Sequence, residues 1–271
     1  MTIVAQSFGS GSSGNGLFIG SGSTSLLIDC GIGPRILAGH LRPHGVGPRD
    51  LSAVLITHEH DDHVRGLASL RKLQAPVRCS TGTARALGLS AVEHVAVFAG
   101  VAFKCRNAEI TAIAVSHDAT EPMGYLIALG GYRICVVTDL GTPNASLAEA
   151  VVQADLIVFE ANHDEHMLRS GPYPAHLKKR VSSDSGHLSN RRTGEFLEEA
   201  LRGDRRPRTI WLAHLSETNN HPSLARSTVA NAFGNDADLH EIVALPRRIP
   251  GPIWRAEPRV RTTQLELLGN S

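Results

Sequence analysis

Short runs of apolar residues alternate with polar, Gly- and Ser-rich segments along the whole chain. In the first half these runs predict strands over residues 2–7, 17–19, 25–28, 53–57, 101–104, 110–115, 125–129 and 133–138. Gly130 and Gly131 separate the last two runs, which is a two-residue hairpin signal. Helices are predicted over residues 34–40 and 67–73, and Asp61 and Asp62 can cap the second one.

Strands and helices alternate in the second half of the chain. Strands are predicted over residues 156–159, 209–213 and 239–244, and helices over residues 143–153, 163–168, 174–181, 189–201 and 223–233. A strand-rich half followed by an alternating half favours two sheets between layers of helices, in one domain over residues 1–245. Residues 246–271 contain several Pro and Arg, and we expect a loosely attached C-terminal tail there.

Composition narrows the classes of function. Of 271 residues, 42% are hydrophobic and 20% are charged, as in ordinary globular proteins. Lys and Arg number 27 and Asp and Glu number 26, so the net charge of +1 predicts no overall attraction to a polyanion. Aromatic residues make up 4%, which argues against a stacking platform for single-stranded nucleic acid. A chain of this length buries a core without a structural metal, so any bound metal is free for chemistry.

The cysteines and the N-terminal residues favour a soluble, cytoplasmic protein. No Cys-x-x-Cys pair occurs among Cys30, Cys79, Cys105 and Cys135, and we expect reduced, buried thiols. Residues 1–7 lack the basic and apolar regions of a signal peptide. The longest apolar runs are too short to span a bilayer, so no membrane contact is expected.

Histidine is the outlier of the composition, with 14 copies. Directly after a predicted buried strand, residues 57–63 place His58, His60 and His63 close to Asp62. Imidazoles and a carboxylate at this spacing suit first-row divalent ions. In an extended turn His58 and His60 share a face and can hold one ion, whereas Asp62 and His63 begin a helix and can hold a second. The alternative is a His-rich surface turn that binds nothing, and the position after a buried strand disfavours it.

Further ligands must come from the ends of other strands. His117, Asp139 and His214 each follow a predicted apolar strand by one or two residues, where loops gather at one edge of a sheet. Each residue has a simpler explanation, since a histidine can be hydrogen-bonded in the core and an aspartate can cap a turn. Together with residues 57–63, the three positions favour a metal site.

These residues resemble the ordered ligand motifs of the metallo-β-lactamase superfamily. The resemblance implies an α/β fold, the four-layer αββα sandwich, with residues 1–245 as its hydrolase domain. It also implies two divalent ions, one held by His58, His60 and His117, the other held by Asp62, His63 and His214, and Asp139 bridging them.

A narrower resemblance covers most of the chain, from residue 10 to about residue 225. Residues 10–15, 117–122, 138–141, 160–164, 171–174, 186–190 and 214–220 are together similar to the YycJ/WalJ (VicX) family. That resemblance implies a cytosolic nuclease with 5′-to-3′ exonuclease activity on DNA, and a role in DNA repair. Residues from Pro246 onward match no motif of that family.

The implied chemistry is metal-dependent hydrolysis of a phosphodiester. Two divalent ions would share a hydroxide that attacks phosphorus, and Asp62 would be catalytic as well as a ligand. Because Asp62 and Asp139 supply oxygen, both Zn²⁺ and Mn²⁺ suit the site. A secreted β-lactamase is disfavoured, since the N-terminal residues do not read as a signal peptide.

The leaving oxygen needs a proton, and His187 is the candidate donor. It lies just before a predicted helix that Ser189 can cap. By analogy with the tRNA 3′-processing members of the superfamily, Glu160 would orient His187. The alternative is that Glu160 only ends a strand and His187 lies on the surface. No Gly- and Lys-rich arm of the kind that grips tRNA is visible in the sequence.

Substrate contacts are predicted in two loops. Ser12, Ser13 and Asn15 lie in the Gly-rich loop over residues 9–16, and Asn219 and Asn220 follow His214. All five can equally be turn residues. Residues 169–208 contain ten Lys and Arg against five Asp and Glu, a local excess of +5 that can follow a phosphate backbone or form a solvated helical surface.

The leading hypothesis is a DNA exonuclease. The alternatives are an RNA-processing nuclease and a small-molecule hydrolase of the same fold that cleaves a thioester, lactone or cyclic phosphodiester. A non-catalytic metal sensor is disfavoured because all seven ligand positions are present. The sequence leaves open the identity of the metal, the choice between DNA and RNA, and the choice between exonuclease and endonuclease action. It also leaves open the oligomeric state and the role of the tail.

Overall fold

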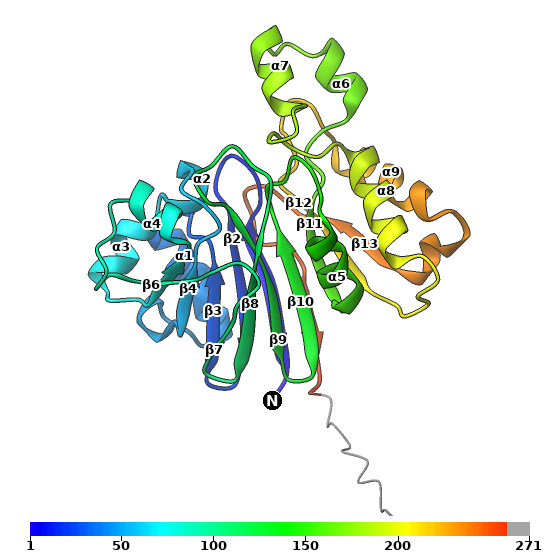
Figure 1. The fold of residues 1–271 in the computed structure, drawn as a ribbon. Coiled ribbons are helices and arrows are strands. Elements are labelled where there is room, and N and C mark those ends of the chain that lie inside the picture. Colours follow the sequence, from blue (N-terminus) through cyan, green and yellow to red (C-terminus); the bar gives the residue numbers. More distant parts are fainter. Residues whose placement is uncertain (259–271) are drawn as a thin grey trace, which may run out of the picture.

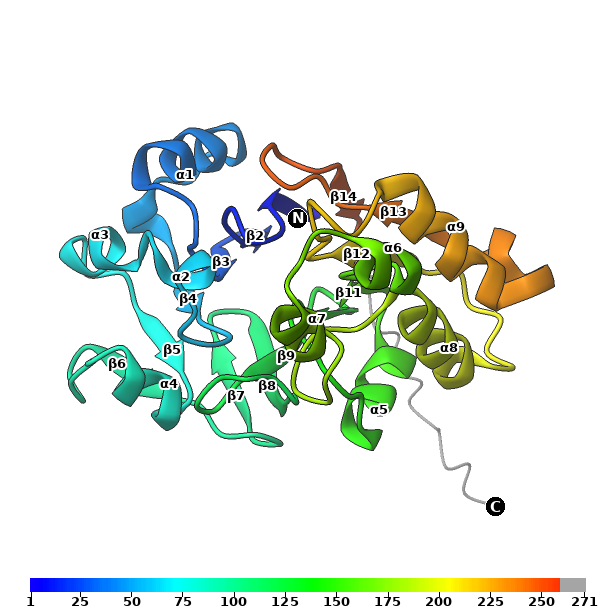
Figure 2. The same cartoon turned by 90° about the horizontal axis from the view of Figure 1, so that it is seen from above.

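Two seven-stranded sheets pack face to face at the centre of the computed structural model, which describes residues 1–258 (Figure 1). The first sheet has the strand order β14-β1-β2-β3-β4-β5-β6, and the second has the order β13-β12-β11-β10-β9-β8-β7. Helices cover the outer face of each sheet (Figure 2). This is the αββα sandwich that the sequence motifs predicted.

The first sheet takes most of its strands from the N-terminal part of the chain. They are β1 (Ile3–Gly9), β2 (Gly16–Ser21), β3 (Thr24–Ile28), β4 (Ala53–Leu55), β5 (Val77–Cys79) and β6 (His94–Ala96). The helices between them are α1 (Pro34–Leu41), η1 (Arg42–His44), η2 (Pro48–Asp50), α2 (Asp61–Val64), α3 (Leu67–Lys72) and α4 (Thr81–Ala86). β1, β2 and β3 are antiparallel, and β3 to β6 are parallel.

The second sheet is antiparallel from β7 to β10 and parallel from β10 to β13. Its strands are β7 (Ala102–Cys105), β8 (Ala108–Ala114), β9 (Met123–Leu129), β10 (Tyr132–Val137), β11 (Leu156–Glu160), β12 (Thr209–Ala213) and β13 (Glu241–Ala244). The helices are α5 (Ala145–Gln153), α6 (Glu165–Ser170), α7 (Ala175–Val181), α8 (Asn190–Leu201), α9 (Pro222–Phe233) and η3 (Gly234–Leu239). Gly130 and Gly131 have positive φ and form the predicted hairpin turn.

The core lies between the sheets and under the helices on each side. Leu26 and Ile28 of β3 face the second sheet, where Tyr125 and Trp211 are buried. Leu27, between them, points to the opposite face and packs with Leu37 of α1. Strands buried on both faces read as continuous apolar runs, which explains why the sequence located them.

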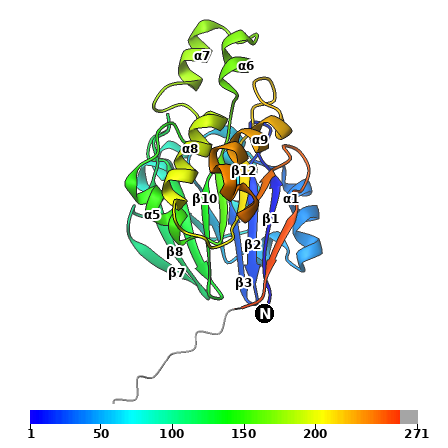
Figure 3. The same cartoon turned by 90° about the vertical axis from the view of Figure 1, so that its right-hand side faces the viewer.

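The carboxyl ends of the parallel strands meet at one edge of the sandwich. The loops after β3, β4, β10, β11 and β12 emerge there, and α6 and α7 stand above that edge (Figures 1 and 3). In open α/β sheets, sites form where such loops converge. None of the helices in residues 1–258 is long and apolar enough to cross a membrane.

Residues 61–73 differ from the sequence prediction. They form two helices, α2 and α3, and the N-cap residue of α2 is His60. Asp61 and Asp62 lie inside the first turn of α2, so the prediction that they cap a helix is wrong. Their position keeps the carboxylates near the helix N-terminus, where the helix dipole favours negative charge.

The segment after Pro246 also differs. β14 (Ile253–Ala256) pairs with β1 in antiparallel register, with Ile3 opposite Ala256. Gly251 N donates a hydrogen bond to Ser7 O. The expected loose tail is therefore wrong for this part, and we infer that the hydrolase domain extends through β14. Residues 259–271 lie outside the described residues.

Candidate metal centre

All seven predicted ligands converge at the carboxyl edge of the sandwich. Two groups of three residues, which we call the first triad and the second triad, each have their donor atoms within 4.8 Å of one another. The first triad is His58, His60 and His117, and the second triad is Asp62, His63 and His214. Asp139 joins them, since it forms a further such group with His58 and His63.

The donor atoms point toward one another at short range. In the first triad, His60 Nδ1 lies 3.0 Å from His58 Nε2 and 3.3 Å from His117 Nε2. In the second triad, Asp62 Oδ2 lies 3.5 Å from His63 Nε2 and 3.4 Å from His214 Nε2.

The residues present fit divalent metal ions. The three imidazole rings of the first triad bring their ring nitrogens close together, an arrangement that a cation between them would stabilise. Asp139 Oδ2 is buried and accepts no hydrogen bond from residues 1–258, although His63 Nε2 lies 3.1 Å away. A buried carboxylate without a donor is costly unless a cation compensates it. Nitrogen and oxygen donors of this kind suit zinc and manganese.

The charges inside the cluster shift the pKa values of its histidines in opposite directions. Burial would lower the pKa of His63 and of His214, but the neighbouring carboxylates raise both above their ordinary values. Burial lowers the pKa of His58 well below its ordinary value, and the neighbouring histidines add to this, so the ring is neutral. Burial would raise the pKa of Asp139, but His214 and His63 hold it well below its ordinary value. Neutral imidazole and ionised carboxylate are the forms that bind metal, so an ion in the second triad would displace protons from His63 and His214.

Asp29 is a functional residue that sequence reasoning missed. It follows β3 with a positive φ of 58°, and its Oδ2 accepts a hydrogen bond of 2.8 Å from His63 Nδ1. Thr57 N donates to Asp29 Oδ1 at 2.8 Å. The contact leaves His63 Nε2 facing the cluster and fixes the ring. The signal was present, because Asp29 follows a buried strand in the same way as Asp139.

Glu160 orients two histidines at once. It is completely buried at the end of β11, and its Oε1 accepts from His187 Nδ1 at 2.7 Å and from His214 Nδ1 at 3.0 Å. Oε2 accepts from the backbone N–H groups of Leu140 and Leu188, at 2.8 and 3.1 Å. Both oxygens are thus held in place, and both histidines present Nε2 on the side away from Glu160.

His187 combines this fixed orientation with access to solvent. Its side chain is 17% exposed, whereas those of His63 and His214 are almost fully buried. Burial would lower the pKa of His187, but the charge of Glu160 and its hydrogen bond raise it above the ordinary value. The ring is tilted against those of His117 and His214, whose centroids lie 5.1 and 5.2 Å away. The predicted His187–Glu160 pair is therefore brought together beside the ligand cluster.

The predicted substrate contacts in the Gly-rich loop between β1 and β2 differ in their exposure to solvent. Ser12 and Ser13 are exposed near the site. Asn15 is buried, its Oδ1 accepts from Gly11 N at 2.7 Å, and its Nδ2 donates to Asp62 Oδ2 at 3.1 Å. Asn15 therefore positions a carboxylate of the second triad.

The two asparagines after His214 are internal. Asn220 is 4% exposed, and its Nδ2 donates to Ala161 O, Asn162 O and Asn190 Oδ1, all at 2.9 Å. It ties the loop after β11 to α8, and its contact with substrate stays a prediction. Asn219 is buried as well. Sequence could not show this, because a turn asparagine and a buried one look alike.

Comparisons with known proteins agree with this geometry. A protein-family model described as the beta-lactamase superfamily domain matches residues 24–214. A protein named exodeoxyribonuclease YycJ from Bacillus anthracis is 34% identical over 230 residues, which cover 83% of this chain and 86% of the relative. A protein named exodeoxyribonuclease WalJ from Streptococcus pneumoniae is 35% identical over 239 residues, which cover 85% and 87%.

Solved structures show the same fold. The metallo-beta-lactamase fold protein YhfI from Bacillus subtilis superposes with a TM-score of 0.71 at 19% identity, over 94% of this chain and 99% of that one. A diphosphatase from the PhnP family superposes with a TM-score of 0.66 at 16% identity, over 96% and 99%.

Family and site lead to the same conclusion. The sequence motifs that predicted the superfamily are the ones that the fold brings together at one edge, and the donor cluster is that of a metal-dependent hydrolase. The chain belongs to the metallo-β-lactamase superfamily and, within it, to the family of the YycJ and WalJ exodeoxyribonucleases.

Proposed function

We propose that this protein is a DNA exonuclease that removes nucleotides from 5′ ends with the help of two divalent ions, Zn²⁺ or Mn²⁺. The observation that carries the proposal is the His187–Glu160 pair beside the seven-residue donor cluster. Phosphodiester hydrolysis needs both parts, one to stabilise charge at phosphorus and one to supply a proton. The names of the two bacterial relatives point to DNA as the polymer.

The first triad would hold one ion, the second triad the other, and Asp139 would bridge them. Two such ions, when bound, lower the pKa of a water molecule and neutralise the charge that develops on the phosphate. The distribution of donors supports this assignment, because each triad forms a separate group and Asp139 lies within reach of both.

Asp62 and His187 would act on the two sides of the reacting phosphate. Asp62 is partly exposed and is held by Asn15, so its carboxylate can orient the attacking water while it serves as a ligand. His187, oriented by Glu160, would donate a proton to the leaving oxygen. Glu160 does not reach the substrate, because it is completely buried.

The approach of DNA would follow the exposed loops above the site. Ser12 and Ser13 lie at one side, and the exposed basic residues of α6 and α7 lie at the other. Contacts of this kind weaken steeply with salt. A cytoplasmic location suits a nuclease of DNA and is part of the proposal.

RNA is the second candidate substrate. A protein named ribonuclease Z from Methanopyrus kandleri is 47% identical over 55 residues, which cover 20% of this chain and 19% of the relative. The match is confined to a short segment, so the DNA proposal has the broader support.

The test is digestion of linear duplex DNA labelled at its 5′ ends, with Mn²⁺ or Zn²⁺, beside RNA of the same sequence. We expect the native protein to release the label from DNA, Asp62→Ala to be inactive, and His187→Ala to be slower by about 10²- to 10⁴-fold. His176→Ala is the matched control, because His176 is exposed on α7. Release by Asp62→Ala at the native rate, or release from RNA only, would contradict the proposal.

A further inference from the structure

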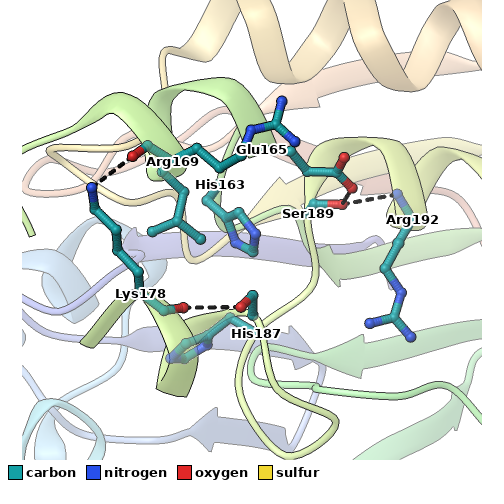
Figure 4. A pocket seen from close by; sticks show the side chains of 9 residues that line it. His163, Glu165, Arg169, Lys178, His187, Ser189 and Arg192 are labelled. Atoms are coloured by element: carbon teal, nitrogen blue, oxygen red, sulfur yellow. Dashed lines mark hydrogen bonds between the residues drawn. The ribbon is translucent and has the colours of Figure 1, made fainter. Parts of the chain in front are cut away.

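A cavity of about 340 Å³ lies between α6, α7 and the start of α8, next to the donor cluster but separate from it (Figure 4). The residues that matter for its chemistry are His163, Leu168, Arg169, Lys178, His187 and Arg192. His187 belongs to both sites, since it lines the cavity and its Nδ1 lies 3.7 Å from Asp139 Oδ1. None of these six residues is a member of either triad.

The cavity carries an excess of positive charge. Arg169, Lys178 and Arg192 line it, and Glu165 is its one acidic residue. Glu165 Oε1 is already occupied, because it accepts from Arg191 Nη2 and from Ser189 Oγ, both at 2.9 Å. Within residues 1–258, the guanidinium groups of Arg169 and Arg192 form no hydrogen bond or ion pair, so both cations remain available to an anion.

His163 adds an unpartnered polar group to the wall. The residue is 3% exposed, and its Nδ1 is buried without a hydrogen-bond partner in the described part of the chain. Burial lowers its pKa to about 4, so the ring is neutral. Figure 4 shows His163 between Arg169 and His187. Buried polar atoms without partners are rare and often mark a place that a ligand or water fills.

We propose that this cavity binds the 5′-terminal nucleotide of the substrate as a nucleoside 5′-monophosphate. The proposal rests on the proposed exonuclease function. The phosphate would contact Arg192 and Arg169, while the sugar and base would lie against Leu168 and His163. Its volume is at the lower end of the range for small-molecule sites, about 300–1,000 Å³, which suits a single nucleotide.

The position of His187 explains why the terminal nucleotide would lie in this cavity. In hydrolysis between the first and second nucleotides, the water oxygen forms the new P–O bond and releases a proton. The bond between phosphorus and O3′ of the first nucleotide breaks, and its electron pair stays on O3′. O3′ takes a proton from His187. The first nucleotide leaves as a 5′-monophosphate, and the second keeps the new phosphate. The leaving oxygen therefore lies at His187, and the nucleotide attached to it lies in the adjoining cavity.

The first experiment measures binding of thymidine 5′-monophosphate to the metal-loaded protein by calorimetry, with thymidine 3′-monophosphate and inorganic phosphate as competitors. We expect Arg192→Gln to weaken binding of the 5′-monophosphate at least tenfold. Arg226→Gln, an exposed arginine on α9, is the matched control and leaves binding unchanged. Equal binding of inorganic phosphate and the nucleotide, or equal affinity of the two variants, would overturn the proposal.

The second experiment measures cleavage of duplexes that carry a 5′-phosphate or a 5′-hydroxyl. We expect the native protein and Arg226→Gln to prefer the phosphorylated end, and Arg192→Gln to lose this preference while it still degrades DNA. A preference that survives in Arg192→Gln would overturn the cavity assignment and leave the exonuclease proposal intact. Conversely, the protein could bind the nucleotide in a way that depends on Arg192 and yet degrade no DNA. That result would support the assignment of the cavity and overturn the exonuclease proposal.

Discussion

The first and second triads are held by different chemistry. In the first triad, His58 Nδ1 lies 3.0 Å from Thr57 Oγ1 and His117 Nδ1 donates to Gly186 O at 3.1 Å, so neutral oxygens orient these two rings. In the second triad, His63 and His214 donate to buried carboxylates. A carboxylate partner makes an imidazole a stronger metal ligand than a neutral oxygen does. The comparison indicates that the second triad is the more firmly organised half of the site.

Exposure differs between individual histidines of the two triads. The side chain of His60 in the first triad is 32% exposed, whereas that of His63 is completely buried. The ring of His60 has only a long contact to a carboxylate, with Nε2 4.0 Å from Asp118 Oδ1. Solvent therefore reaches His60 more readily than it reaches the histidines of the second triad.

Replacement of Glu160 should have the largest effect. Glu160→Gln removes the charge that orients both His187 and His214, and its amide nitrogen cannot accept from Leu140 or Leu188. We expect losses of about 10- to 100-fold in metal affinity from the second triad alone, and a further loss in the cleavage rate. Mass spectrometry measures the bound metal and single-turnover cleavage measures the rate, so the two losses can be separated. Native metal affinity in this variant would contradict the comparison.

Replacement of Asp29 tests the second triad without touching His187. Asp29→Asn weakens the partner of His63, and we expect metal affinity to fall by about 10-fold or more while the dependence of the rate on a 5′-phosphate stays native. Asp238→Asn, an exposed carboxylate in η3, is the control. If both variants retain metal equally, the buried carboxylate does not organise the triad.

Replacement of Asp118 should have the smallest effect. Its side chain is 29% exposed, its Oδ2 forms an ion pair with Arg180 Nε at 2.6 Å, and its Oδ1 lies 3.3 Å from His117 Nε2. Exposed ion pairs contribute about 0.2–1 kcal/mol, so we expect Asp118→Asn to change metal affinity by less than about fivefold. A larger loss in equilibrium dialysis would mean that the first triad also depends on a carboxylate.

The parts of the fold that sequence predicted are those with local signals. β3, β10, β11 and β12 are apolar runs buried on both faces, and the hairpin at Gly130 and Gly131 lies within one short segment. Residues 77–96 had no such signal, because β5 and β6 are only three residues long and β6 is partly exposed. β14 was missed for a different reason, since its partner is at the other end of the chain.

The same difference between local signals and contacts of distant segments applies to the site. The ligands were predicted because residue type and position after a strand mark them, and the fold brings all of them together. Their catalytic roles stay predictions. The role of Asn220 could not be inferred, because it depends on burial against α8. The cavity beside His187 could not be inferred either, since α6, α7 and α8 build it jointly.

We propose that two ions, one held by each triad, act together on DNA. The most direct measurement titrates Mn²⁺ into metal-free protein and follows bound metal and release of a 5′ label in the same samples. We expect release to begin only when the second ion binds, and we expect Asp139→Asn, in which an amide replaces the carboxylate that would join the two triads, to release no label. Full release with one bound ion per chain, or two bound ions with no release, would contradict it.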